Sequence, residues 1–270
     1  MNMTGTKLNI LPVPTFAQLG VNYAERDIGT LGKEKIAVPA GAEQQLIQFI
    51  GADSKTTVAV GENASLKLVR VFAGTQRRVS ELSAVLADNA RLELIQLYLG
   101  GDTVSEIVTE LGSRAAFITD IGYDLGADSA LDLNLVAVHH GKKSRSEITV
   151  NGVLRDNARK TFKGTIDFRN GASGAKGSEK EDVILMDETV VNKTVPVILC
   201  EEEDVEGSHG ATIGRIDGQH IHYMQSRGIP EEKIYELITR SRLTGIINRI
   251  GDEQAEKRVY SALGWGDDVE

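Results

Sequence analysis

Residues 87–100 have the sequence ADNARLELIQLYLG, a small-residue turn followed by nine residues with strand character. Leu92, Leu94, Gln96 and Tyr98 alternate with Glu93, Ile95 and Leu97. An alternation with period 2 is typical of a β-strand. The segment therefore predicts a tight turn that feeds one strand of a repetitive β structure.

The same turn-plus-strand unit recurs along the chain. Its closing alanine stands at residues 64, 90, 115, 130 and 158, so the gaps are 26, 25, 15 and 28 residues. Repeats of this length indicate stacked rungs, with small turn residues that let successive rungs pack together. We therefore expect an all-β chain built as a β-helix-like solenoid. A β-sandwich with glycine-rich turns remains the alternative.

The pattern divides the chain into three parts: an N-terminal segment over residues 1–57, a β-helix core over 58–215 and a C-terminal helical segment over 216–270. Residues 42–50 fit either a short helix or the first strand, and 171–178 (GASGAKGS) predict a bend. Asp217 is a candidate helix N-cap. Pro230 with two following glutamates predicts the start of another helix, and a last one is expected over about 252–263.

Composition excludes several classes of function. The chain has 270 residues, a net charge of −9 and only 5% aromatic residues. Nucleic acid is not expected as a partner, because phosphate neutralisation needs a basic face. The single cysteine, Cys200, cannot form an internal disulfide, and no apolar run reaches the ~20 residues of a membrane span. We expect a soluble cytoplasmic protein.

No nucleotide-binding motif is complete. In GASGAKGS, Lys176 is followed by Gly177, whereas a phosphate-binding loop needs Ser or Thr after its lysine. If the protein's work uses ATP, a partner must supply the ATPase. Most histidines also favour structural roles: His139 and His140 point to opposite faces of a strand, and His220 and His222 diverge on a helix.

His209 is the strongest candidate for chemistry. It lies between Gly207 and Gly210, where strands are expected to give way to helix, and glycine there leaves room for the ring to point outward. Neutral imidazole is a good metal ligand. Cys200 ends an apolar run, and such a cysteine is usually inert and buried.

Three segments carry a resemblance to a known family. SHGATIGRID (208–217), HYMQSRGIPEEKIYELI (222–238) and the preceding residues 177–202 resemble the SufB/SufD family, the scaffold proteins of iron–sulfur cluster assembly. The similarity is strongest over 151–243. The resemblance implies a right-handed parallel β-helix with C-terminal helices, dimerisation through the β-helix, and no catalytic turnover. It also implies docking of a SufC-like ABC ATPase, here expected around Arg227, Tyr235, Leu237 and Ile238.

In this family a nascent cluster is shared between two chains. The SufD-type histidine falls on His209, whereas the SufB-type cysteine falls on Glu181 and the SufB-type glutamate on Gly210. The resemblance thus implies a SufD-like subunit with a SufB-like partner and His209 as an interface ligand. Cys200, Glu181 and Glu206 are weaker alternatives. A self-paired homodimer working with the ATPase remains open, and a β-helix enzyme acting on polysaccharide or acyl groups is the rival from another class.

Overall fold

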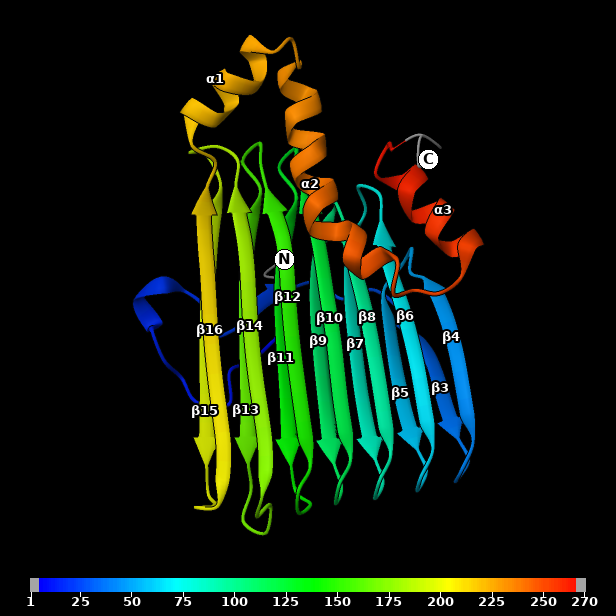
Figure 1. Cartoon of the computed structure of the whole chain (residues 1–270). Helices are drawn as coiled ribbons and strands as arrows, with labels where there is room; N and C mark the ends of the chain where they lie inside the picture. The colour runs from blue at the N-terminus through cyan, green and yellow to red at the C-terminus, as the bar shows by residue number, and fades with distance from the viewer. Residues whose placement is uncertain (1–4, 266–270) are drawn as a thin grey trace.

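Two parallel sheets form the body of the protein (Figure 1). The computed structural model describes residues 5–265. The even sheet contains β4 (Glu43–Phe49), β6 (Ser65–Ala73), β8 (Arg91–Leu99), β10 (Ala116–Leu125), β12 (Arg145–Leu154), β14 (Ala175–Leu185) and β16 (Val205–Arg215). The odd sheet contains β3 (Gly32–Val38), β5 (Ser54–Val60), β7 (Arg77–Leu86), β9 (Asp102–Leu111), β11 (Ala130–His139), β13 (Arg159–Phe168) and β15 (Val191–Cys200).

Each of these strands pairs in parallel with the strand two positions before or after it in the chain. The chain therefore alternates between the two sheets and climbs one rung per two strands. This is a parallel β-solenoid, so the predicted β-helix is confirmed and the β-sandwich alternative is wrong.

The irregular spacing of the repeat has a simple origin. Ala64, Ala90 and Ala115 precede strands of the even sheet, whereas Ala130 begins a strand of the odd sheet and Ala158 precedes one. The 15-residue gap is therefore half a rung, and the gaps of 25 to 28 residues are whole rungs. Four of the five alanines, all except Ala130, are buried, because small side chains let the turns of neighbouring rungs stack closely.

Of the two alternatives for residues 42–50, the structure has the strand, β4, but β3 precedes it, so rungs already form before residue 58. The bend predicted for 171–178 ends at Gly174, because residues from Ala175 onward belong to β14. His139 is fully buried and its neighbour His140 is exposed, which confirms that they occupy opposite faces.

A strap at the N-terminus crosses the outer face of the odd sheet. Strands β1 (Thr6–Leu8) and β2 (Ala24–Arg26) pair in antiparallel fashion and flank the 3-10 turn η1 (Ala17–Leu19). Leu8 packs on Val79 and Val104. Further along the sheet, the Lys163 ammonium donates to the backbone carbonyl of Asn9 at 2.9 Å. These contacts bind the strap to the outside of the solenoid.

Three helices follow the last strand: α1 (Gly218–Ser226), α2 (Glu231–Ile247) and α3 (Glu253–Ala262). Asp217 caps α1 by accepting from the Gln219 amide at 2.9 Å, as predicted. The C-terminal half of α2 covers the outer face of the even sheet, where Leu243 and Ile246 pack against Ile95 and Leu97. Its N-terminal half rises past the ends of the strands together with α1 (Figure 1). None of the helices described is long and apolar enough to cross a membrane.

Candidate functional site

His209 lies in the middle of β16, the terminal strand of the even sheet. The expected position at the junction between strand and helix is wrong, because the strand continues to Arg215 and helix begins only at Gly218. Neither flanking glycine has a positive φ. Gly207 instead lies in a tightly packed place, since a Cβ there would approach the ring of Phe168 to 3.1 Å.

The register of the sheet shows which way His209 faces. It pairs with Glu179, and that row continues through Ile148, Thr119 and Leu94 on successive strands. Paired residues of a parallel sheet project to the same face. The other four residues named in this row are buried inside the solenoid, whereas His209 is exposed. His209 therefore closes an interior row at the open end of the solenoid, beyond which residues 5–265 supply no further rung.

The weaker candidates lie in three different environments. Glu181 is fully buried, where it forms an ion pair with Lys160 and accepts from the Thr194 hydroxyl at 2.6 Å. Its carboxylate is therefore already partnered within this chain. Glu206 is exposed and pairs with Lys176 at 2.7 Å. Cys200 ends β15 on the same terminal rung as His209 and is exposed, so the expectation of an inert buried thiol is wrong.

These residues do not assemble a metal site within one chain. Among residues 5–265, no cluster of three or more His, Cys, Asp or Glu side chains is placed to hold a metal ion. His209 stands as a single exposed imidazole on a strand whose outer edge has no partner in the described part of the chain. A single ligand at an open edge can complete a coordination sphere only with groups from a second molecule.

The interior of the solenoid next to His209 contains charged side chains that the sequence analysis did not predict. Glu179, Glu181 and Lys160 are all buried there. Burial, with a contribution from the neighbouring charge of Glu181, raises the pKa of Glu179 to about 7. Gly164 makes room for this acid, because a Cβ at residue 164 would overlap the Glu179 carboxylate. The sequence does contain a signal for this buried charge. With a period of 2, the acids at 179 and 181 face the same way as the apolar Val183, which points inward.

The predicted ATPase-contact residues lie on or beside the helical hairpin, which we define as α1 and the N-terminal half of α2. Arg227 follows α1, and its guanidinium sits 5.1 Å from the ring centre of the exposed Tyr223. Tyr235 donates from its hydroxyl to Glu231 at 2.8 Å. Leu237 is exposed and Ile238 is half-buried on the projecting half of α2. The hairpin thus exposes Leu237 and the Arg227–Tyr223 pair, whereas Tyr235 lines a cleft that faces the turns of the solenoid.

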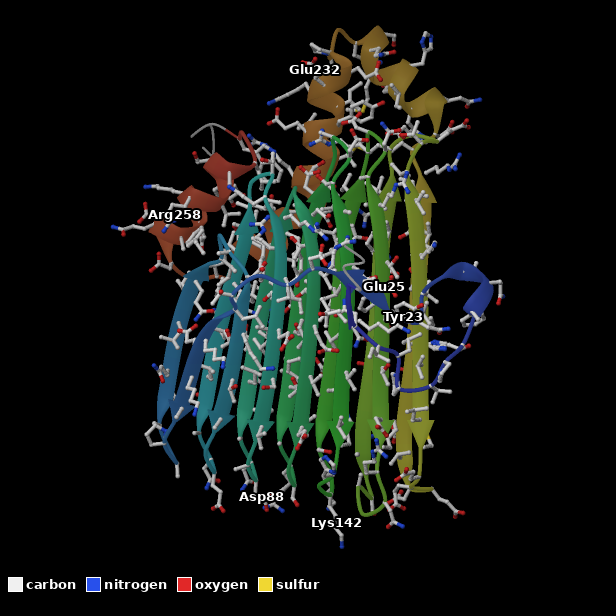
Figure 2. The ribbon with its side chains drawn as sticks, turned by 180° about the vertical axis from the view of Figure 1, so that it is seen from behind. Tyr23, Glu25, Asp88, Lys142, Glu232 and Arg258 are labelled. Atoms are coloured by element: carbon white, nitrogen blue, oxygen red, sulfur yellow. The ribbon has the colours of Figure 1, made fainter. Side chains whose placement is uncertain are left out.

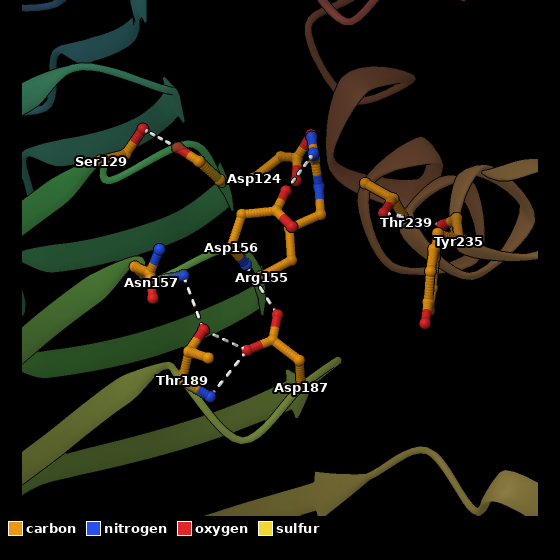
Figure 3. A network of polar contacts seen from close by, with 10 residues as sticks. Asp124, Ser129, Arg155, Asp156, Asn157, Asp187, Thr189, Tyr235 and Thr239 are labelled. Atoms are coloured by element: carbon orange, nitrogen blue, oxygen red, sulfur yellow. Dashed lines mark hydrogen bonds and ion pairs between the residues drawn. The ribbon is translucent and has the colours of Figure 1, made fainter. Parts of the chain in front are cut away.

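A cleft of about 870 Å³ separates the base of this hairpin from the turns of the solenoid. Figure 3 shows its floor, where Arg155 bridges Asp124 at 3.3 Å and Asp156 at 3.1 Å. Asp187 accepts from the backbone amides of Asp156 and Thr189 at 2.7 and 2.8 Å. These carboxylates are occupied in bonds within and between three neighbouring turns.

The curated relatives with a similar sequence are all described as iron–sulfur cluster assembly proteins. The chain is 28% identical over 211 residues to the iron–sulfur cluster assembly protein SufD of Bacillus subtilis, which is 76% of this chain and 48% of that protein. It is 30% identical over 112 residues to SufD of Escherichia coli, or 42% of this chain and 26% of the relative. A SufBD family protein of Mycobacterium bovis, Mb1496, is 27% identical over 130 residues, or 48% and 15%.

The chain thus spans about half the length of the Bacillus subtilis relative and less of the others. A family model described as "SUF system FeS cluster assembly, SufBD core domain" matches residues 30–242. The matched span starts just before β3, includes His209 and ends within α2. The chain belongs to the SufBD family of iron–sulfur cluster assembly proteins and is similar to its SufD members.

Proposed function

We propose that this protein is a SufD-like scaffold subunit that performs no chemical turnover of its own. In this proposal a SufB-like chain docks on the open end of the solenoid, and His209 offers one neutral nitrogen to a nascent iron–sulfur cluster at the shared edge. The cluster is cargo and is held only with the partner's groups. We place this work in the cytoplasm, where ATP is available to the partner ATPase.

The observation that carries the proposal is the position of His209. On strands β8 to β14 its row is buried, and it becomes exposed at β16, an edge strand without a neighbour among residues 5–265. Between Glu206 and Arg215 the strand has no Lys, Arg, Asp or Glu. Natural edge strands are commonly blocked by such charges. An unblocked edge is suited to pairing, and pairing would bring a partner's side chains up to His209.

The helical hairpin supports the second half of the proposal. The N-terminal half of α2 and α1 project from the body with Tyr223 and Leu237 exposed. Large exposed apolar side chains are typical of a protein-binding surface. We infer that a SufC-like ABC ATPase binds this hairpin, and that its ATP cycle acts on the scaffold through α2.

The test is co-expression with a SufB-like chain and a SufC-like ATPase from the same organism. His209→Ala is expected to lower the iron and sulfide recovered with the complex and its charge-transfer absorbance, while the complex itself still forms. His222→Ala is a matched control, because His222 is also exposed but lies on α1. Unchanged iron and sulfide in the His209 variant would exclude the ligand role.

A self-paired homodimer is the second candidate, because the stretch of β16 without charged residues, from Gly207 to Gly214, is suited to pairing with the same strand of a second copy. Light scattering on the purified chain separates the candidates: a dimer without any SufB-like chain supports self-pairing, and a monomer that pairs only with that chain supports the heterodimer.

A further inference from the structure

The N-terminal strap contains an apolar arm, defined here as residues 10–23, that the proposed function does not use. Ten large hydrophobic side chains are exposed in the described part of the chain, and five of them lie in this arm. They are Ile10, Val13, Phe16, Leu19 and Tyr23, with exposed fractions from 41% to 57%. Such a concentration within one short segment indicates a surface that another molecule covers.

The arm is held in a defined shape. The Leu11 amide donates to the Asn22 carbonyl at 2.9 Å, and the Thr15 amide donates to the Asn22 side chain at 3.0 Å. Phe16 adopts a left-handed backbone conformation, with φ 48° and ψ 44°. A bulky residue in that region is strained, and such strain is often found at binding sites. The exposed ring of Phe16 is therefore presented by an ordered turn.

The arm is anchored at the open end of the solenoid. Leu11 and Val21 are buried against Val195 of β15, the terminal strand of the odd sheet. The Lys193 ammonium, also on β15, donates to the Leu19 carbonyl at 2.6 Å. In Figures 1 and 2 the blue segment with η1 projects past the yellow terminal strands. The arm thus extends beyond the edge at which the chain ends its own sheets.

The terminal rung continues the same apolar character. Val191 on β15 and Ile213 on β16 are also among the exposed hydrophobic residues, at 38% and 50%. A second solenoid docked against this rung would cover both side chains. Because the arm lies on the outer face of the odd sheet and reaches past β15, it would then lie on the outer face of the partner's adjoining sheet.

We propose that the apolar arm clasps a second SufBD-family solenoid docked on the β15–β16 end, with Phe16 and Leu19 as its main contacts. This inference rests on the pairing edge of the proposed function and adds a second surface to it. Buried aromatic and aliphatic anchors commonly supply much of the affinity of an interface. The partner's matching feature is an apolar strip on its outer face beside its own terminal strand.

The test measures association of the full-length chain with itself and with a SufB-like chain of the same organism by sedimentation velocity. Phe16→Ser combined with Leu19→Ser is expected to weaken the complex about tenfold or more. Val85→Ser is the matched control, because Val85 is 53% exposed on β7; its complex should stay within about twofold of wild type. Ile213→Lys on the pairing edge is expected to abolish association.

The outcomes separate the two hypotheses. If Ile213→Lys abolishes association and the double variant does not change it, the arm plays no part and the edge proposal stands. If Ile213→Lys leaves the complex intact, the pairing edge itself is wrong. Absence of any complex overturns both.

Hydrogen exchange of wild-type residues 10–23 provides a check that needs no variant. Slower exchange in the complex supports the clasp, and unchanged exchange overturns it. Slower exchange only with phosphatidylcholine–phosphatidylglycerol vesicles would assign the arm to a membrane surface instead and also overturn the proposal.

Discussion

Lys160 and Glu181 form an ion pair inside the solenoid, and neither side chain is exposed to solvent. The two residues come from different sheets, β13 and β14, so the pair joins the walls of the last complete interior layer. Thr194 of β15 bonds to both partners, at 3.1 Å to Lys160 and 2.6 Å to Glu181. Glu181, which the sequence offered as a weaker candidate ligand, therefore has a structural role in this chain.

Lys160→Met is expected to destabilise the fold by about 3–5 kcal/mol, because it leaves the Glu181 carboxylate buried without a counter-charge. The double variant Lys160→Met with Glu181→Leu should recover most of that loss, since apolar groups of similar volume replace both charges. Urea unfolding of the three proteins measures both values. A single variant as stable as wild type would show that water reaches Glu181 in solution.

Glu179 should make stability fall as pH rises. Its pKa in the folded protein is about 7, above the ordinary value of 4.5, because burial and the nearby Glu181 disfavour its charge. Between pH 4.5 and 7 the folded state therefore binds more protons than the unfolded state, and unfolding becomes easier as pH increases. The full effect is up to about 3 kcal/mol.

The difference between wild type and Glu179→Gln isolates this term from the other titrating groups. The stability of wild type relative to the variant should decline from pH 4.5 to 7 and then level off. A difference that does not change with pH would mean that Glu179 titrates normally.

Gly122 on β10 is expected to be essential for the seating of α2. A Cβ at this position would lie 2.7 Å from Leu97, 3.1 Å from Leu243 and 3.2 Å from Ile246. Gly122→Val should therefore overpack this contact, cost about 1–3 kcal/mol and loosen the helix. Trp265, the single tryptophan, contacts Tyr260 nearby and should report the change in its fluorescence.

Gly245→Ala within α2 is the matched control for Gly122. A Cβ at residue 245 meets no atom within 4 Å. Alanine has the higher helix propensity, so the variant should be more stable than wild type by up to about 1 kcal/mol. If both glycine variants lose stability equally, the contact beneath α2 does not explain the effect.

Leu237→Asp is expected to weaken ATPase binding without unfolding the chain. Leu237 is 42% exposed on the projecting half of α2, so a charge there costs little in the free protein but opposes burial in a complex. Val85→Asp, on β7 of the odd sheet, carries the same new charge far along the chain and should bind normally. Calorimetry measures the affinity of each variant for a SufC-like ATPase. Equal affinities of the two variants would contradict the docking role.

Much of the architecture was predictable from local sequence. Alternation in segments such as 91–99 and the recurring alanines favoured the solenoid over a β-sandwich, because strand period and turn chemistry act over a few residues. The caps at Asp217 and the start of α2 were equally local. By contrast, β4 was ambiguous and β3 was not predicted, since short apolar runs do not distinguish helix from strand.

The sequence by itself determined the strands of the rungs, the C-terminal helices and the family of the chain, in which His209 is the candidate ligand. Only the tertiary structure decided that Glu181 is already ion-paired with Lys160, that Cys200 is exposed, and that His209 lies at the open edge of a row whose neighbouring members are buried. The reason is physical: partners in a parallel solenoid are about one rung apart in sequence, and whether an inward position is buried depends on whether another rung follows it.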